Sequence, residues 1–423
     1  MHVAIIGNGV TGVTAATRIR QKQPNWNITL ISGESTYHYS RPALMYIFMG
    51  HLTYKQTKPF DDSFWDEQRL ILKRDWVTGI APKDRQLFLH RSPPMVYDKL
   101  LIATGSKSNK FGWPGQDLAG VQGLYSLLDL QKLYENVRHT KKAVIVGGGL
   151  IGIELAEMLH SRNIEVTFVI RESAYWDNIL PAEEASLISR IIEAQGIRLI
   201  RETQIKEMVD NGAGRVCAVV TDSGERIDCE LVGLTVGVSP NIDLFKGSQI
   251  ETNRGILVDR SFRTSAPEVF AAGDCAEMKS ESGERNLVQQ VWYTGKKQGE
   301  VAGSVIAGEM QVYDPGIWYN SAKFFDLEYQ VYGQVNLRVP GEKNLYWESP
   351  SGRQAFRIVY TDQGVIGFNF MGIRGRHQVC ERWIQEKRSL DEVLDRLEEA
   401  NFDPEFFQRY EPVIRQTLKE QAA

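Results

Sequence analysis

The sequence predicts an α/β fold with two dinucleotide-binding units and a C-terminal α+β segment, and three observations support this. Glycines in G-x-G-x-x-G spacing occur twice, 147 − 7 = 140 residues apart, each time between an apolar run and a helical stretch. Past residue 310, strand-like segments are followed by helical ones. The 423 residues are enough for two or three domains.

The first glycine group follows the apolar run at residues 3–6. Gly7 permits a tight turn, Gly9 lets the backbone approach a pyrophosphate, and Gly12 allows a helix to pack closely on the strand. The helix that begins here directs unpaired N–H groups and the positive end of its dipole at the phosphates. After a second strand, NITLIS, comes Glu34, 34 − 12 = 22 residues beyond the third glycine. An acid at about this spacing binds ribose hydroxyls.

The second group repeats the pattern with Gly147, Gly149 and Gly152. Its second strand, EVTFVI, leads into Arg171 and Glu172, which are 19 and 20 residues past the third glycine (171 − 152 and 172 − 152). An acid here suits the free 2′-hydroxyl of NAD, whereas an arginine suits the 2′-phosphate of NADP. Because Arg171 is expected directly after the strand, NADPH is favoured. The alternative is a solvent-facing Arg–Glu pair.

Three further segments end strands with residues that let a ligand approach the backbone. They read KLLIATGS, LVGLTVGVSPN and VFAAGD, and a helix is expected after the last. An aspartate in the last segment can accept a hydrogen bond from a ligand hydroxyl. The residues at these strand ends are Ala103, Thr104, Gly105, Gly237, Gly273 and Asp274.

With these motifs in this order, the chain resembles the two-dinucleotide flavoprotein reductases of the pyridine nucleotide–disulfide oxidoreductase superfamily over residues 1–310. The resemblance implies two Rossmann-like domains, one inserted in the other, and a smaller C-terminal domain that often dimerises. It implies an FAD-binding domain at 1–112 and 238–312, an NAD(P)H-binding domain at 113–237 and an interface domain at 313–423. Carried over by position, FAD is held by Gly7, Gly9, Gly12, Glu34 and Asp274, and the pyridine nucleotide by Gly147, Gly149, Gly152 and Arg171.

One stretch matches a branch of that superfamily and then departs from it. YSRPAL is similar to the Y-S-R-P-P-L-S-K segment of ferredoxin, rubredoxin and nitrite reductase flavoproteins, which implies that Arg41 and Pro42 lie against FAD. Those relatives end the segment with a lysine near the flavin, where this chain has Tyr46. The glutamate that pairs with the lysine is present as Glu154. We therefore expect Glu154 to have a raised pKa, to bond Tyr46 or to reach another cation. Tyr46 can alternatively be a core aromatic residue.

Composition narrows the function further. A net charge of −4 gives no general attraction to nucleic acid or anionic membrane. A strand expected from residue 2 or 3 leaves no room for a signal peptide, and no apolar run is long enough to span a bilayer, so a soluble cytoplasmic protein is expected. The cysteines form no C-x-x-C pair, which disfavours a disulfide framework, a metal site or a dithiol made from sequence neighbours. They are Cys217, Cys229, Cys275 and Cys380.

Electrons taken from NAD(P)H must then leave to an external acceptor. The candidates are a small iron–sulfur or haem protein, a quinone, another small oxidant or oxygen. By resemblance, Gln289, Gln290 and Trp292 line the flavin pocket, with packing as the alternative for Trp292. Basic pairs at 296–297 or 374–376 can dock an acidic carrier.

Three hypotheses remain open at this stage. The first is an FAD-dependent NAD(P)H reductase of an electron-carrier protein, and the second is an NAD(P)H oxidase or quinone reductase. The third is a non-catalytic flavoprotein redox sensor. A homodimer built on the C-terminal segment is compatible with each of them.

Overall fold

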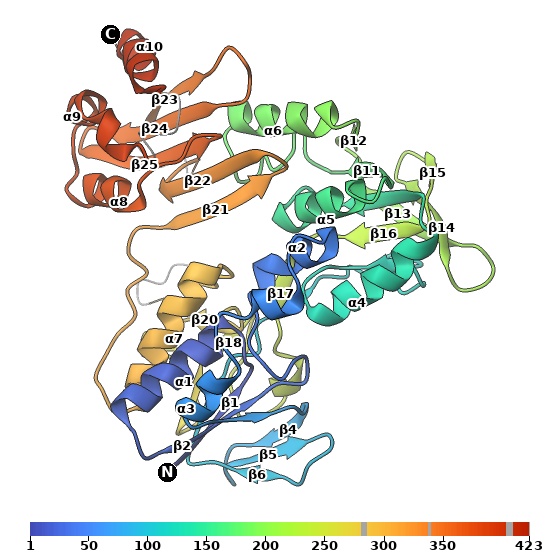
Figure 1. Cartoon of the computed structure of the whole chain (residues 1–423), viewed down its shortest axis with the longest axis vertical. Coiled ribbons are helices and arrows are strands. Elements are labelled where there is room, and N and C mark those ends of the chain that lie inside the picture. Colours follow the sequence, from blue (N-terminus) through green and yellow to red (C-terminus); the bar gives the residue numbers. More distant parts are fainter. Residues whose placement is uncertain (281–285, 337–339, 403–408, 423) are drawn as a thin grey trace. The chain divides into compact units, whose positions relative to one another are not determined.

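The computed structural model describes residues 1–280, 286–336, 340–402 and 409–422. The chain divides into two compact units (Figure 1). The first contains Met1–Phe111, Gln122–His139 and Leu234–Asp314. The second contains Gly112–Val121, Thr140–Gly233 and Pro315–Ala423. The C-terminal segment therefore belongs to the same unit as the second glycine group.

The first unit is built on a five-stranded sheet in the order β19–β7–β1–β2–β3, and its neighbouring strands pair in parallel. Its strands are short apolar runs that are buried, as expected for a parallel sheet covered on both faces. Their bounds are β1 His2–Ile6, β2 Asn27–Ile31, β3 Leu70–Lys73, β7 Lys99–Ile102 and β19 Val269–Ala271.

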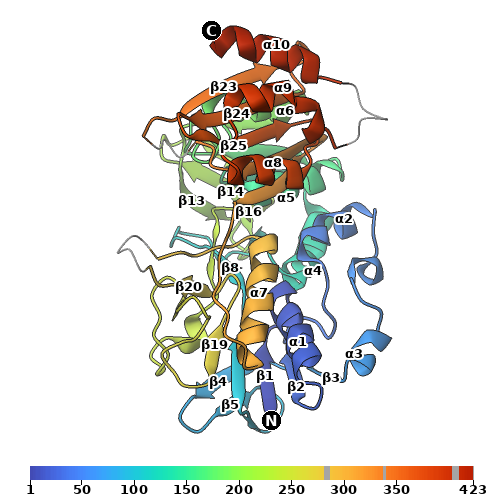
Figure 2. The ribbon, with the colours of Figure 1, turned by 90° about the vertical axis from the view of Figure 1, so that its left-hand side faces the viewer.

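Two helices of this unit, α1 (Val10–Lys22) and α7 (Trp292–Ile306), lie side by side (Figures 1 and 2). Small residues every fourth position on α7 make the close approach possible. A Cβ atom at Gly299 would lie 2.5 Å from the carbonyl oxygen of Thr11, and one at Gly303 would lie 2.8 Å from that of Ala15. The Thr11 hydroxyl donates to the carbonyl of Gly295 at 2.9 Å. The two helices are therefore held in one fixed register.

Smaller elements complete the first unit. The segment at residues 41–49 forms a 3-10 turn and then α2, as the apolar spacing predicts. The expectation of a helix directly after Asp274 is wrong, because strand β20 follows and α7 begins only at Trp292. The remaining elements are α2 Leu44–Met49, α3 Ser63–Glu67, α4 Leu127–Asn136, β4 Val77–Ala81, β5 Gln86–Leu89, β6 Met95–Val96, β8 Ser106–Ser108, β17 Val238–Pro240, β18 Ile256–Val258 and β20 Ala276–Met278.

The second unit holds a second five-stranded sheet, in the order β12–β11–β10–β16–β9, and an antiparallel sheet β13–β14–β15. The repeat seen in the sequence is thus a structural repeat, in which β10–α5–β11 corresponds to β1–α1–β2. The bounds are β9 Val121–Gln122, β10 Lys142–Val146, α5 Leu150–His160, β11 Glu165–Val169, α6 Ala182–Ala194, β12 Arg198–Ile200, β13 Ile205–Asp210, β14 Val216–Thr221, β15 Arg226–Asp228 and β16 Leu231–Leu234.

The C-terminal part of this unit is an antiparallel sheet, β21–β22–β25–β24–β23, with helices against it (Figure 1). As expected, strand segments are followed by helices: β24 and β25 form a hairpin that turns at residues 362–363, and Ser389 is the N-cap of α9. Arg357 on β24 is buried and donates to Glu184 on α6 at 2.7 Å, which connects this antiparallel sheet to a helix of the second glycine-loop domain. The bounds are β21 Tyr319–Phe324, β22 Leu327–Gly333, β23 Lys343–Glu348, β24 Ala355–Thr361, β25 Gly364–Met371, α8 His377–Gln385, α9 Leu390–Asp395 and α10 Glu411–Ala422.

Among the described residues, no helix combines the length and apolar character needed to cross a bilayer.

Candidate functional site

The first glycine loop has the geometry that its spacing predicts. Gly7 has φ 111°, and a Cβ atom there would lie 2.1 Å from the carbonyl oxygen of Ala103. A Cβ atom at Gly12 would lie 2.1 Å from the carbonyl oxygen of Gly7. Gly9, at the N-cap of α1, has nothing within 4 Å of a built Cβ and no side-chain cap. The N–H groups at the start of α1 therefore face open space.

Glu34 lies just past β2 and is held by four donors from its own unit. One carboxylate oxygen accepts from the backbone N–H of Leu127 at 2.7 Å and from the Tyr39 hydroxyl. The guanidinium of Arg41 supplies the other two donors, one to the second oxygen at 3.0 Å and one to the first at 3.3 Å. Burial alone would raise the pKa of Glu34, but the charge and hydrogen bonds of Arg41, with those of Tyr39 and Leu127, outweigh burial and lower it. Glu34 is thus a preorganised anion.

Asp274 is a second partly buried acid of this unit. Its carboxylate accepts from the Ser106 hydroxyl at 3.0 Å and from the Tyr125 hydroxyl at 3.2 Å. Burial raises the pKa of Asp274, against the opposing hydrogen bonds of Ser106 and Tyr125 and the charge of Arg41. The Gln290 side chain donates to the Ser106 hydroxyl at 2.7 Å and so supports the same cluster.

Tyr125 links the two acids, and the sequence motifs gave no indication of it. Arg41 lies over the Tyr125 ring at 4.6 Å and donates to its carbonyl oxygen at 2.7 Å. The hydroxyl of Tyr125 contacts Asp274 and also accepts from the backbone N–H of Ser106 at 2.9 Å. Burial, with the Asp274 charge, raises the pKa of Tyr125, so its phenol stays protonated. The one signal in the sequence was Gly105, where a Cβ atom would lie 2.9 Å from this hydroxyl.

Four more of the residues expected near this site have the following surroundings. Thr104 donates to the carbonyl of Asn241 at 2.8 Å, and Gly273 has φ 81° with its N–H bonded to Gln298. Gly237 has φ 88° and its carbonyl accepts from Asn109, while Pro42 is exposed in the turn before α2. These residues shape the backbone around the cluster.

Gln289 and Trp292 have different surroundings from Gln290. Gln289 is buried and accepts from the Tyr313 hydroxyl at 2.9 Å, which makes it part of an internal network. Trp292 is 40% exposed at the start of α7. Of the three residues expected to face the flavin, only Gln290 contacts the Asp274 cluster.

The second glycine loop repeats the first. Gly147 has φ 106° and its N–H donates to the carbonyl of Val169 at 3.0 Å. Gly149, at the N-cap of α5, has nothing within 4 Å of a built Cβ. Gly152 is buried one turn into the helix. The space beside the N-cap of α5 is therefore open, as it is beside the N-cap of α1.

The charged residues that follow β11 in the second unit differ from those that follow β2 in the first. Arg171 is the second residue after the strand, not the first as expected, because Ile170 intervenes. Its side chain is 72% exposed and donates to the Glu172 carboxylate at 2.9 Å. The Glu172 side chain is 15% exposed. Both a cation and an acid are therefore available at this end of β11.

Comparison with known proteins decides the family. The model of the family described as "Pyridine nucleotide-disulphide oxidoreductase" matches residues 1–299. The chain belongs to this family.

Curated members of the family include electron-carrier reductases and oxidases. The ferredoxin–NAD(+) reductase component of the biphenyl dioxygenase system of Paraburkholderia xenovorans is 30% identical over 309 residues, 73% of this chain and 75% of that protein. An NADH oxidase of Methanocaldococcus jannaschii is 29% identical over 344 residues, 78% of this chain and 75% of that protein. A solved NAD-dependent persulfide reductase from A. fulgidus shares the fold, with a TM-score of 0.87 at 24% identity, over 100% of this chain and 83% of that one. The chain is accordingly an oxidoreductase that uses FAD and NAD(P)H.

The residues of the first unit fit FAD as this family binds it. Any side chain at Gly7 or Gly12 would overlap backbone, and the space beside Gly9 is open for a diphosphate. Arg41 supplies a cation for the diphosphate, and Glu34 and Asp274 supply acceptors for ribose and ribityl hydroxyls.

The two residues expected to be catalytic belong to different units, and each is described within its own. Tyr46 lies on α2, partly buried, with its ring stacked on His51 at 6.2 Å. Glu154 lies on α5, partly buried, and has no hydrogen bond or ion pair among the described residues of its unit. Burial, and then the like charge of Glu157, raises the pKa of Glu154 to about 7. The predicted raised pKa is confirmed.

All four cysteines are free thiols. Two of them meet across antiparallel strands, since the N–H of Cys229 donates to the carbonyl of Cys217 at 3.1 Å. Burial raises the pKa of Cys229 to about 12 and that of Cys275 to about 11. Neither is therefore a thiolate at neutral pH.

Proposed function

We propose that this family member is an NAD(P)H reductase of a small electron-carrier protein and that it works without a redox-active disulfide. The observation that carries the proposal is the segment YHYSRPALMYIFMG. It supplies Arg41 to the Glu34 cluster but contains no cysteine to accept electrons from the flavin. The relative that acts as a ferredoxin–NAD(+) reductase supports the choice of acceptor.

The first unit, with residues 1–112 and 238–312 at its centre, is proposed to hold FAD. The free N–H groups of α1 and the guanidinium of Arg41 bind the diphosphate, while Glu34 and Asp274 accept hydrogen bonds from hydroxyls. When bound, FAD accepts hydride from reduced nicotinamide and releases electrons to the next carrier. The chain positions this chemistry, since its donors and acceptors are already fixed by one another.

The unit containing residues 113–237 is proposed to hold NAD(P)H on its own glycine loop. Gly147, Gly149 and Gly152 admit the diphosphate, and the exposed Arg171 favours the 2′-phosphate of NADPH. Among the residues that the structure describes, Arg171 bonds its neighbour Glu172 and no other side chain, so it can turn toward a ligand.

Glu154 and Tyr46 are proposed to be the catalytic residues, one in each unit. A carboxyl with a pKa near 7 changes charge in the working range, so it can bias the positive charge that develops on the nicotinamide. Tyr46 replaces the lysine of relatives and supplies a neutral phenol instead of a cation. Glu154 consequently has no salt-bridge partner of the usual kind.

A second candidate function is an NAD(P)H oxidase. The oxidase of Methanocaldococcus jannaschii favours it, because the match to that protein covers 78% of this chain. The two candidates differ only in where the electrons leave.

One anaerobic experiment separates these functions. The FAD-loaded protein is reduced with one equivalent of NADPH or NADH in a stopped-flow instrument and then mixed with a [2Fe–2S] ferredoxin, a rubredoxin, menadione or oxygen. We expect reoxidation by a carrier protein to be at least tenfold faster than by oxygen. Faster reoxidation by oxygen or menadione would assign the oxidase or quinone reductase, and slow reoxidation by all four would leave a redox sensor.

Independence from a disulfide is tested on the two cysteines that meet. Cys217→Ser and Cys229→Ser, singly and together, are expected to leave carrier reduction unchanged. A loss of turnover that follows either cysteine would show an internal dithiol.

A further inference from the structure

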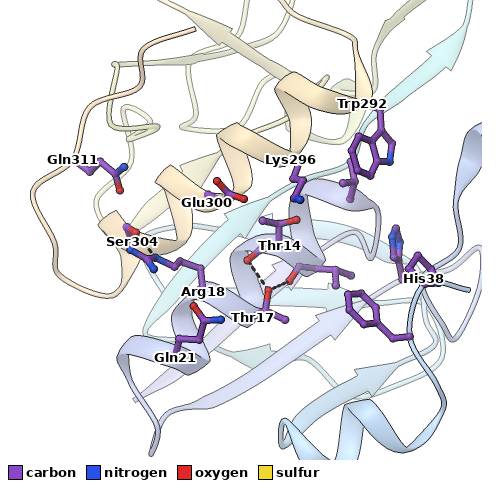
Figure 3. Close-up of a pocket in the computed structure, with 14 residues that line it drawn as sticks. Thr14, Thr17, Arg18, Gln21, His38, Trp292, Lys296, Glu300, Ser304 and Gln311 are labelled. Carbon is purple, nitrogen blue, oxygen red and sulfur yellow. Dashed lines mark hydrogen bonds between the residues drawn. The ribbon is translucent and has the colours of Figure 1, made fainter. Parts of the chain in front are cut away.

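A groove on the first unit lies outside the FAD cluster. It has a volume of about 520 Å³ and runs between α1, α7 and the chain at residues 38–60 (Figure 3). Trp292, which the resemblance places at the flavin, lines it, but none of the glycines and acids assigned to FAD above does. Its floor is the α1–α7 contact, which the glycines of α7 hold in fixed register, so the groove is a preformed feature of the unit.

His38 is the buried polar group of this groove. It is 6% exposed, and its Nδ1 is 2.8 Å from the carbonyl oxygen of Asn8. Because a carbonyl oxygen only accepts, the proton of this bond is on Nδ1. Burial, against the bond to Asn8, lowers the pKa of His38 to about 4, so the ring is neutral and Nε2 is an acceptor. Nε2 has no hydrogen-bond partner among the described residues of this unit and is not one of their fully buried unpaired polar atoms, so it is accessible to a donor from a ligand.

Beside His38 are two aromatic rings and one cation. Trp292, labelled in Figure 3, is 40% exposed, and the Phe60 ring, which also lines the groove, has its centre 6.4 Å from that of His38. Lys296 Nζ lies 5.9 Å from the centre of the Trp292 ring and has no ion pair among the first unit's described residues. This end therefore combines an acceptor, flat apolar surface and an unneutralised positive charge.

The far end of the groove is less suited to a charged ligand. Arg18 already donates to the Ser304 hydroxyl at 2.8 Å and pairs with Glu309 at 3.4 Å. Glu300, between the two ends, adds a negative charge. A ligand with one acidic group near Lys296 matches this distribution, whereas a polyanion along the whole groove does not.

We propose that this groove binds a small planar organic acid that carries a hydroxyl or amide donor. The donor bonds His38 Nε2, the ring lies against Trp292 and Phe60, and the acidic group pairs with Lys296. Few polar groups at fixed positions on apolar walls are what small-molecule sites use for orientation. Binding of this acid does not require the function proposed above, although Lys296 is also one of the basic residues considered for docking a carrier.

Three matched compounds test it by equilibrium dialysis against the FAD-loaded protein. The probe 6-hydroxy-2-naphthoate has both the donor and the acid, 2-naphthoate lacks the donor, and 2-naphthol lacks the acid. We expect the probe to bind with a dissociation constant of about 100 μM, a value in keeping with its size. Each partial compound should bind about tenfold more weakly.

Variants then connect each group to its residue. Lys296→Met should weaken the binding of the two carboxylates about tenfold and leave the binding of 2-naphthol unchanged. His38→Asn keeps a donor for Asn8 but removes Nε2, so it should weaken the hydroxyl compounds and leave 2-naphthoate unchanged. Lys297→Met is the control, because Lys297 is also exposed on α7 and does not line the groove.

The proposal is overturned if the probe shows no saturable binding up to 1 mM, or if Lys297→Met weakens it as much as Lys296→Met does. A uniform loss of all three compounds in His38→Asn also counts against it. If His38→Asn fails to retain FAD, the pattern of Lys296→Met across the three compounds decides. Carrier reduction is measured separately, so either result leaves the proposed function to stand or fail by itself.

Discussion

The two glycine loops have the same backbone geometry but different surroundings beyond the second strand. Gly7 donates to Ile31 at 2.8 Å and Gly147 to Val169 at 3.0 Å, and both N-cap glycines face open space. In the first loop, however, Glu34 is fixed by four donors that are themselves packed. In the second, Glu172 is held by Arg171, whose side chain is 72% exposed.

This difference corresponds to two kinds of ligand. A site whose polar groups are already oriented loses little entropy on binding and therefore holds its ligand tightly. A site with an exposed, mobile cation gives weaker binding and faster exchange. The first loop is thus suited to a resident cofactor and the second to a nucleotide that must leave after each turnover.

Replacement of Arg41 by methionine should have the largest effect. The substitution removes the cation proposed to bind the FAD diphosphate and leaves Glu34 without its ion pair. FAD binding should weaken about 100-fold, which corresponds to about 2.7 kcal/mol of binding free energy. Titration of the apoprotein with FAD measures this change, and Arg171→Met serves as the control because it should leave FAD affinity unchanged. A loss of less than threefold would show that the first loop is not preorganised around Arg41.

The second loop should respond more weakly and only to one nucleotide. Arg171→Met should raise the dissociation constant for NADPH about tenfold, as expected for one partly screened charge on a phosphate, and leave that for NADH unchanged. Rates of flavin reduction at increasing nucleotide concentration give both constants. Equal effects on the two nucleotides would contradict a 2′-phosphate role and favour Glu172 as a ribose acid.

The glycine loops and the first acid could be predicted from the sequence because each depends on local spacing. Gly7, Gly12 and Glu34 lie within one strand–helix–strand repeat, and their positions follow from φ angles and close packing. Tyr125 could not be predicted, since it reaches Asp274 from 149 residues away and no spacing rule connects them. The tautomer of His38, in the segment YHYSRPALMYIFMG, could not be predicted either, because it depends on the hydrogen bond to the carbonyl oxygen of Asn8.

The helix expected after Asp274 shows a different limit. Alanine and glutamate at 276–277 favour a helix by propensity, yet these residues form β20, paired in parallel with β18. The N–H of Gly255 donates to the buried Glu277 carboxylate at 2.8 Å, which supports the strand. Tertiary pairing thus outweighs a weak local preference.

The pH dependence of the flavin reduction rate tests the role of Glu154 in the second unit. With the pKa of Glu154 at about 7, the carboxyl is neutral below and charged above that pH, so the reduction rate should rise about fivefold between pH 6 and 8. Glu154→Gln should give a flat profile. An unchanged profile would remove Glu154 from hydride transfer.

The same shift has a consequence for stability. The pKa of Glu154 in the folded protein, about 7, lies above the ordinary value of 4.5 for a glutamate in the unfolded chain. Between pH 4.5 and 7 the native state therefore binds more protons than the unfolded state. The free energy of unfolding consequently falls as the pH rises through this range. Glu154→Gln removes this dependence. Its melting temperature relative to the parent protein should therefore increase by about 2 °C from pH 5 to pH 8. A constant difference would mean that Glu154 is solvated like an ordinary surface carboxyl.

The smallest effect is expected at Tyr125, where only a hydroxyl is removed. Tyr125→Phe keeps the ring under Arg41 but deletes the bonds to Asp274 and to the N–H of Ser106, so FAD binding should weaken about threefold. Tyr134→Phe is the matched control, because that phenol donates to the carbonyl of Ile47 at 3.0 Å, away from the two acids. If both variants bind FAD equally well, the hydroxyl of Tyr125 only fills space. A threefold loss confined to Tyr125 means that the first loop owes part of its order to a residue outside every motif.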